Sequence, residues 1–211
     1  MNDLVYKVKD KEYIVNITYK RIRNIHYRFK DDHFEVSCSR LTSKKAIIQG
    51  LDKFAETLIE KSSKTSPIGD DYIYLFGDKH NINESGKISF GEYGEITYRS
   101  KDELIKKLKV MFLKVIEPRV RYYEVKMNLP SYRITLRNMT TRYGSNSKRS
   151  KHITFATTLL HYSIPIIDSV IVHELAHIKE FNHSKKFYDV VYKYYPDYDY
   201  YHKKLRRGEF K

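Results

Sequence analysis

Residues 173–183 read HELAHIKEFNH, and this run decides the fold of the C-terminal half of the chain. On an α-helix His173 and His177 are four residues apart, so both imidazoles leave the same face about one turn from each other. This spacing lets two nitrogens reach one zinc ion at about 2.0–2.1 Å. Glu174 takes the next angular position, where its carboxylate can hydrogen-bond water at the metal. This is the general-base geometry of a zinc hydrolase.

His183 follows His177 by six residues and is a ready third ligand. For its imidazole to turn back on the metal, the helix must end first. We expect Asn182 to take the left-handed conformation that ends a helix and Ser184 to cap the next one. Three protein ligands leave the fourth position open for water, as in catalytic zinc sites. The residues also allow His183 to be a plain loop histidine, with an acidic residue such as Glu180 as the third ligand.

The residues before and within the motif predict a buried helix. Its apolar side chains are Ile166, Ile167, Val170, Ile171, Val172 and Leu175. Buried histidines and a buried glutamate need polar partners, and a metal ion supplies them. The alternative is an amphipathic helix whose histidines are solvated or packed in the core. All four methionines precede the motif, which excludes the metzincins because their Met-turn follows it.

Three stretches of the C-terminal half resemble the YgjP-like metallopeptidases, which are relatives of the SprT-like zincins. They read ITLRNMTTRYGSNSKRSKHITFATTLL (134–160), IPIIDSVIVHELAHIKEFNHSKKFYDVV (164–191) and YYPDY (194–198). The matching features are a strand with a basic residue, an aromatic residue, Gly and Ser at its end, a second strand, H-E-L-x-H, then N-H-S and F. The residues at the strand end are Arg142, Tyr143, Gly144 and Ser145. The family usually has Trp in place of Tyr143 and often a cysteine in place of Asn146.

The resemblance implies the chemistry of the motif. In this family His173, His177 and His183 would bind one zinc ion per chain, and Glu174 would be the catalytic base. Hydrolysis of peptide bonds in a protein or peptide substrate also follows from the resemblance, since the motif alone permits other zinc hydrolases.

A sheet-edge strand beside the metal is the expected substrate-binding element in a minimal zincin, where it holds an extended peptide by main-chain hydrogen bonds. We assign this role to the strand ending near Tyr143, with Arg142, Gly144 and Ser145. The alternative is an ordinary hairpin strand under the helix.

The tail after the motif is rich in aromatic residues. Residues 187–201 predict a helix that packs over the active helix, followed by a turn at Pro196. A Tyr or His from this tail is a candidate for stabilising an oxyanion, and core packing is the alternative use. We expect His202 to be exposed, because it lies in a run of Lys and Arg.

The patterns along the chain predict an α+β fold, with a β-rich N-terminal part followed by a minimal zincin-like catalytic half. We place the first subdomain at residues 1–99 and the second at residues 100–211. The first holds short strands over 4–38, a helix over 43–61, a polar loop over 62–71 and a meander of short strands up to residue 99.

The second subdomain opens with a capping box formed by Ser100 and Glu103. The long helix that follows is expected to be kinked or divided at Pro118. A strand over 132–137, a loop over 138–151 and a second strand form a hairpin before the metal-binding helix. Helix, strand hairpin, H-E-x-x-H helix and C-terminal helix is the order of a minimal zincin.

Charge is distributed unevenly along the chain. Residues 1–100 hold 17 Lys and Arg against 15 Asp and Glu, a net of +2, whereas residues 101–211 hold 23 against 11, a net of +12. A basic half favours acidic partners such as DNA, RNA or acidic proteins. The leading contacts are Arg142, Lys148, Arg149 and Lys151. The alternative to a peptidase is therefore a nucleic-acid-binding protein, and SprT-like proteins that cleave DNA-attached proteins combine both activities. A solvated Lys-rich surface explains the charge equally well.

Composition predicts a globular protein without a membrane span, because no apolar run approaches eighteen residues. The first fifteen residues lack the apolar region of a signal peptide. A single cysteine, Cys38, excludes an intramolecular disulfide and suits a reducing compartment. We therefore expect a cytoplasmic protein.

Overall fold

The computed structural model describes residues 4–62 and 66–211. Contacts divide the chain into two compact units, residues 1–65 and residues 66–211. This boundary differs from the division after residue 99 that the sequence suggested. The short strands before residue 99 contribute Ile73, Leu75 and Ile88 to the same apolar core as the helices after residue 100, so they belong with the second unit.

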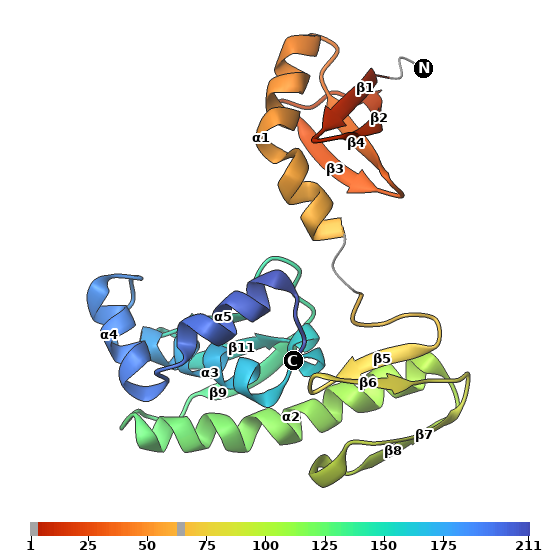
Figure 1. Cartoon of the computed structure of the whole chain (residues 1–211). Helices are drawn as coiled ribbons and strands as arrows, with labels where there is room; N and C mark the ends of the chain where they lie inside the picture. The colour runs from red at the N-terminus through yellow and green to blue at the C-terminus, as the bar shows by residue number, and fades with distance from the viewer. Residues whose placement is uncertain (1–3, 63–65) are drawn as a thin grey trace. The chain divides into compact units, whose positions relative to one another are not determined.

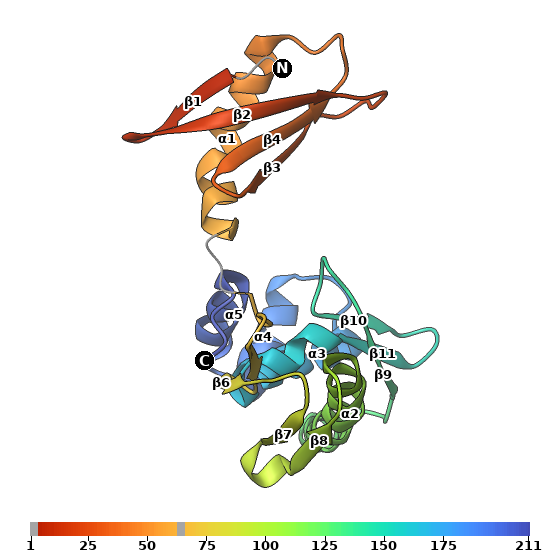
Figure 2. The same ribbon diagram turned by 90° about the vertical axis from the view of Figure 1, so that its right-hand side faces the viewer.

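The first unit is a four-stranded sheet with a helix across one face (Figure 2). Its elements are β1 (Leu4–Val8), β2 (Lys11–Tyr19), β3 (His26–Lys30), β4 (His33–Cys38) and α1 (Lys44–Ser62). The strand order is β1-β2-β4-β3, and β2 runs parallel to β4. Alternation in β4 places Phe34 and Val36 in a core with Ile47 and Leu51 of α1, while Glu35 lies on the other face. The short strands expected over residues 4–38 are confirmed.

The second unit begins with two hairpins (Figure 1). Their strands are β5 (Tyr72–Leu75), β6 (Asp78–Asn81), β7 (Gly86–Ser89) and β8 (Glu95–Tyr98), with a 3-10 turn η1 (Gly91–Tyr93) inside the second hairpin. The hairpins form separate two-stranded sheets rather than one continuous meander.

Helix α2 (Lys101–Lys126) is the longest element of the second unit. The Ser100 hydroxyl accepts the backbone N–H of Glu103, as the capping box predicts. Of the two expectations for Pro118, a division of the helix is wrong, since α2 runs through this residue without interruption, and a kink stays a prediction. Proline removes one backbone hydrogen bond. Packing of the buried residues Val115 and Val120 on either side of it keeps the helix whole.

The sheet of the second unit that lies against α3 has three strands, in the order β10-β11-β9. They are β9 (Arg133–Arg137), β10 (Gly144–Ser147) and β11 (His152–Ala156). Strands β9 and β11 were expected to form a hairpin, but they pair in parallel. The reason is that the expected loop over 138–151 contains a further strand, β10. Strand β10 pairs antiparallel with β11 and forms one edge of the sheet. Tyr143 therefore precedes this edge strand and does not end one.

Helix α3 (Ile164–Lys179) follows a 3-10 turn η2 (Thr157–His161) and carries the HExxH motif. It packs against β10, α2 and the C-terminal helices. An ion pair fixes its start, because Arg119 of α2 donates from Nε to Asp168 Oδ1 at 2.6 Å. The Tyr123 hydroxyl donates to the other carboxylate oxygen at 3.2 Å. These polar contacts set the rotation of an otherwise apolar helix.

The C-terminal segment forms two helices, α4 (Lys185–Tyr194) and α5 (Tyr198–Arg207), where one was expected. The turn between them falls at Pro196, as predicted. Both helices pack on α3. Among residues 4–62 and 66–211, no helix is both long enough and apolar enough to cross a membrane.

Candidate metal centre and active site

Three histidines converge at the C-terminal end of α3. His173 and His177 come from this helix, and His183 comes from the segment that joins it to α4. One ring nitrogen from each lies within 4.8 Å of the other two. Glu180, the alternative third ligand, is not part of this group.

The main chain reaches His183 by a different route from the one expected. Asn182 is absent from the residues with positive φ, so the predicted left-handed conformation is wrong. Instead, Glu180 ends the helix in an extended conformation, with φ −124° and ψ 110°. The Ser184 hydroxyl caps α4 by accepting the backbone N–H of Phe187, as predicted. The extended conformation of Glu180 and the start of α4 at Ser184 together bring the His183 ring back beside α3.

One pair of nitrogens in the cluster has nearly the spacing that a tetrahedral metal ion requires. The Nε2 atoms of His173 and His183 are 3.1 Å apart. Two nitrogens bound at 2.0–2.1 Å to a tetrahedral zinc ion lie about 3.4 Å from each other. The opposite nitrogens of the two helical histidines already have partners. His173 Nδ1 lies 2.8 Å from the Tyr198 hydroxyl, and His177 Nδ1 lies 3.1 Å from the carbonyl oxygen of Phe181. Their Nε2 atoms therefore remain for a metal.

The surroundings of two of these imidazoles, those of His173 and His177, favour the neutral form. Burial lowers the pKa of His173 to about 3, and the neighbouring histidines lower it further. Burial also lowers the pKa of His177. The ring of Phe187 packs against all three histidines, with centroid distances of 4.6–5.0 Å. Neutral imidazole is the form that binds a metal, so His173 and His177 are in the form that a ligand requires.

Glu174 lies beside the cluster without belonging to it. Its side chain is buried against the backbone of β10, and a Cβ atom built on Gly144 would overlap Glu174 Oε1 and lie 2.6 Å from its Cγ. Burial raises the pKa of Glu174 to about 8, and the positive charge of Arg142 opposes this rise. The Asn146 side chain donates to the Glu174 carbonyl oxygen at 2.8 Å, which ties α3 to the edge strand.

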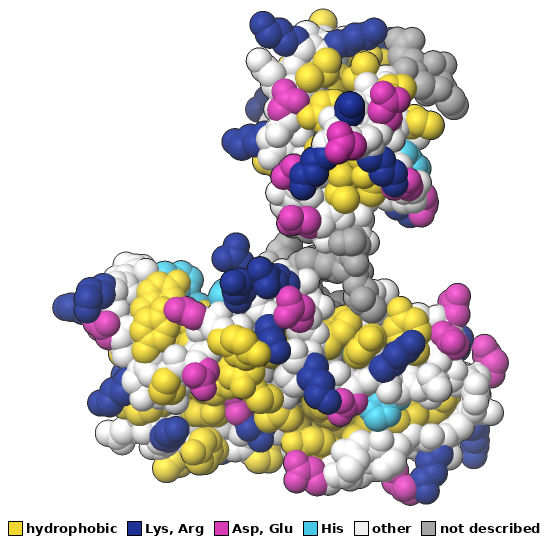
Figure 3. Space-filling model, viewed as in Figure 1, with side chains coloured by type: hydrophobic (Ala, Val, Ile, Leu, Met, Phe, Trp, Pro, Cys, Tyr) yellow, Lys and Arg dark blue, Asp and Glu magenta, His cyan; other side chains and the backbone are white. Residues whose placement is uncertain are grey.

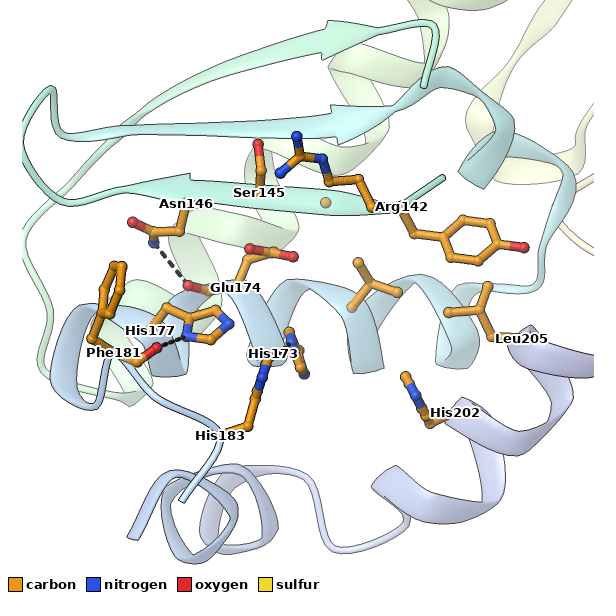
Figure 4. A pocket seen from close by; sticks show the side chains of 13 residues that line it. Arg142, Ser145, Asn146, His173, Glu174, His177, Phe181, His183, His202 and Leu205 are labelled. Atoms are coloured by element: carbon orange, nitrogen blue, oxygen red, sulfur yellow. Dashed lines mark hydrogen bonds between the residues drawn. The ribbon is translucent and has the colours of Figure 1, made fainter. Parts of the chain in front are cut away.

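These groups line a single pocket of about 440 Å³ (Figure 4). The four residues assigned to substrate binding all lie on its wall: Arg142, Tyr143, Gly144 and Ser145. The Tyr143 hydroxyl lies 3.0 Å from that of Tyr162, so the core holds this ring. The remaining basic candidates, Lys148, Arg149 and Lys151, are exposed in the turn between β10 and β11 and do not line the pocket.

Two residues of α5 lie at or behind the opposite wall, and the sequence did not indicate that His202 is one of them. His202 was expected to be exposed, but it is half-buried and lines the pocket together with Leu205. Tyr198 is buried beneath it and contacts His173. Both belong to one face of α5, because they are four residues apart. The four-residue spacing of Tyr198 and His202, the same as that of His173 and His177, was the feature of the sequence that could have indicated a shared helix face.

A family model agrees with this site. The model of the YgjP-like metallopeptidase domain matches residues 23–208. Two crystal structures found by comparison are the metallopeptidase zymogens abylysin of Pyrococcus abyssi and jannalysin of Methanocaldococcus jannaschii. They are 19% and 23% identical, cover 43% and 44% of this chain and 90% and 94% of their own chains, and each has a TM-score of 0.41. No curated protein matches. The family match spans both units and includes all three histidines, and the chain belongs to the YgjP-like metallopeptidase family.

Proposed function

We propose that the protein is a zinc-dependent peptidase in which His173, His177 and His183 hold one zinc ion and Glu174 is the general base. One observation carries the proposal. A buried carboxylate lies in the same pocket as three converging imidazoles but outside their group. A closed structural site has no use for such a base, whereas an open catalytic site requires one.

The chain supplies a base and a strand edge for the substrate. Bound zinc would act as a Lewis acid that lowers the pKa of water and polarises a carbonyl group. The Glu174 carboxylate accepts a proton from the attacking water and passes it to the nitrogen of the leaving amine. Gly144 holds this carboxylate in place, because the missing Cβ leaves the space that it occupies.

The edge strand β10 is the proposed binding element for an extended peptide. Its backbone runs along the pocket from Gly144, and its outer edge faces away from β11. A peptide that adds to this edge gains main-chain hydrogen bonds that do not depend on its sequence. Arg142 and Ser145 line the same wall and are the side chains placed to contact the substrate.

A second candidate function uses the turn between β10 and β11. Lys148, Arg149 and Lys151 are exposed there, and none forms an ion pair within the described ranges. On the face seen in Figure 3, the basic side chains of the second unit are mixed with acidic ones, so the overall charge alone defines no binding surface. The unpaired turn favours a nucleic acid or an acidic protein held close to the pocket.

Replacing Glu174 with Gln should lower kcat by about 10²- to 10⁴-fold, because only the proton acceptor is removed. Zinc content should stay at one ion per chain, measured by elemental analysis of the same preparation. Loss of zinc from this variant would make Glu174 a ligand and contradict its assigned role.

Replacing His183 with Ala should weaken zinc binding by more than the roughly 10- to 100-fold typical of a group that only contacts a ligand. Competition with a chromogenic chelator measures this. His26→Ala, an exposed histidine of the first unit, is the matched control and should bind zinc like the parent. Equal affinities in the two variants would place the third ligand elsewhere.

Replacing Gly144 with Ala should displace the Glu174 carboxylate without removing a ligand. A misplacement of about 1 Å in a catalytic group can cost about 10²-fold in rate, and we expect a loss of that order with full zinc occupancy. Ser147→Ala changes an exposed residue of the same strand and serves as the control. Unchanged turnover in Gly144→Ala would show that the close contact has no catalytic consequence.

Replacing Lys148, Arg149 and Lys151 with Ala tests the second candidate. If they contact phosphates, the slope of log affinity against log salt should fall by roughly 0.7–0.9 for each contact, while hydrolysis of a small neutral peptide stays unchanged. The control removes the same charge from the exposed side of α2 through Lys106, Lys109 and Lys114. Equal slopes in both triple variants would mean that the turn has no special role, and no binding by the parent at low salt would end this idea.

A further inference from the structure

Tyr198 connects a zinc-site histidine to a second histidine in the pocket wall. Its hydroxyl oxygen lies 2.8 Å from His173 Nδ1 and 3.2 Å from His202 Nδ1. The three rings are nearly parallel, with interplanar angles of 9–22°. Tyr198 is 2% exposed, so water does not compete for these hydrogen bonds. The arrangement is a short, shielded chain that runs from α3 through α5 to the pocket.

The position of each proton in this hydrogen-bonded series follows from the tautomer of His173. The Nε2 atom of His173 faces the cluster, 3.1 Å from His183 Nε2. A neutral imidazole that binds a metal through Nε2 carries its hydrogen on Nδ1, so His173 donates to the Tyr198 oxygen. The Tyr198 hydroxyl has one hydrogen and can donate it only to the remaining neighbour, His202 Nδ1. His202 Nδ1 is then an acceptor, and the ring hydrogen of a neutral His202 lies on Nε2.

The free end of this chain points at the site of reaction. Figure 4 shows His202 projecting from α5 into the pocket, across from β10 and Glu174. Within the described residues, no protein group forms a hydrogen bond with His202 Nε2, while Nδ1 is occupied by Tyr198. His202 is also outside the group of nitrogens that could share a metal ion. It is therefore a hydrogen-bond donor with a fixed direction and an open position in front of it.

We propose that His202 is a catalytic residue whose Nε2–H donates to the carbonyl oxygen of the scissile peptide bond, and that Tyr198 is the positioning residue that sets its tautomer. This rests on the proposed peptidase function. Negative charge develops on the carbonyl oxygen as the bond is attacked, so the hydrogen bond strengthens in the transition state. Glu174 handles protons on the β10 side, and His202 stabilises the oxygen from the α5 side.

The first test is His202→Leu. Removing one donor to a developing oxyanion costs about 10²- to 10³-fold in kcat, and we expect that loss with KM and zinc content unchanged. His202→Gln places an amide donor near the Nε2 position and should recover part of the rate. Zinc loss in His202→Leu would make His202 a ligand, and full activity in that variant would refute the proposal.

Binding of a transition-state analogue gives a readout that does not depend on turnover. The affinity for a phosphinic peptide, which presents a charged tetrahedral oxygen, should fall in His202→Leu by the same factor as kcat. The affinity for the corresponding product peptide should change much less. An equal loss for both ligands would assign His202 to general substrate contact and contradict the proposed role.

The tautomer is read directly by ¹⁵N NMR of histidine side chains in the zinc-loaded protein. The parent should show His202 protonated on Nε2, and Tyr198→Phe should give a mixture of tautomers together with a lower rate. Tyr192→Phe, which removes a hydroxyl bonded only to Asp199, is the matched control and should leave the spectrum unchanged. Protonation of His202 on Nδ1 in the parent would overturn the proposal.

The outcomes separate this inference from the function on which it rests. A zinc-loaded parent that hydrolyses no peptide would count against the peptidase, while the tautomer and the analogue affinities would still decide the role of His202. An active parent whose His202→Leu variant is equally active would leave the peptidase intact and refute only the role of His202.

Discussion

The close approach of α3 to the edge strand β10 is the constraint on which the rest of the site depends. Gly144 has no Cβ, and the Glu174 carboxylate occupies the space that one would fill. Asn146, two residues further along the same strand, donates a side-chain hydrogen bond to the backbone carbonyl of Glu174 and so ties α3 to β10. This contact region therefore buries the Glu174 carboxylate, orients it, and places the edge of β10 beside the histidines. A bulkier residue at position 144 would disturb all three.

The second unit is arranged to hold α3 at this distance. Asp168 receives two donors from α2, Arg119 and Tyr123, and these fix the helix on the side away from the pocket. On the pocket side, α4 and α5 supply Phe187 beneath the three imidazoles and Tyr198 behind His173. The three imidazoles are thus supported by packing, and hydrogen bonds at Nδ1 also orient the rings of His173 and His177.

Local signals predicted most of the fold. Alternating apolar residues located the strands of the first unit, and the caps at Ser100 and Ser184 located the starts of two helices, because these features depend on neighbours in sequence. The motif itself brought together three of the four central residues of the site. Strand β10 was missed because Gly-Ser-Asn-Ser has little β propensity and pairs only through β11. Its pairing depends on tertiary structure.

Contacts distant in sequence explain the other errors. Pro118 does not divide α2, because core packing on both sides outweighs one lost hydrogen bond. His202 sits among basic residues that indicate a solvated helix face, yet α5 turns this one side chain toward α3. Its role could be read only after Tyr198 and His173 were seen together. The division between the units lies after residue 65 and not after residue 99, because the apolar residues of the two hairpins pack in the core of the second unit.

The account rests on a metal ion held by three histidines with one position open to substrate. The most direct test is an anomalous difference map at the zinc edge from crystals grown with zinc. The account predicts one peak within about 2.0–2.1 Å of a nitrogen of His173, His177 and His183, with the remaining position free of protein. A peak that omits His183, or one closed by Glu174 or His202 as a fourth protein ligand, would contradict it.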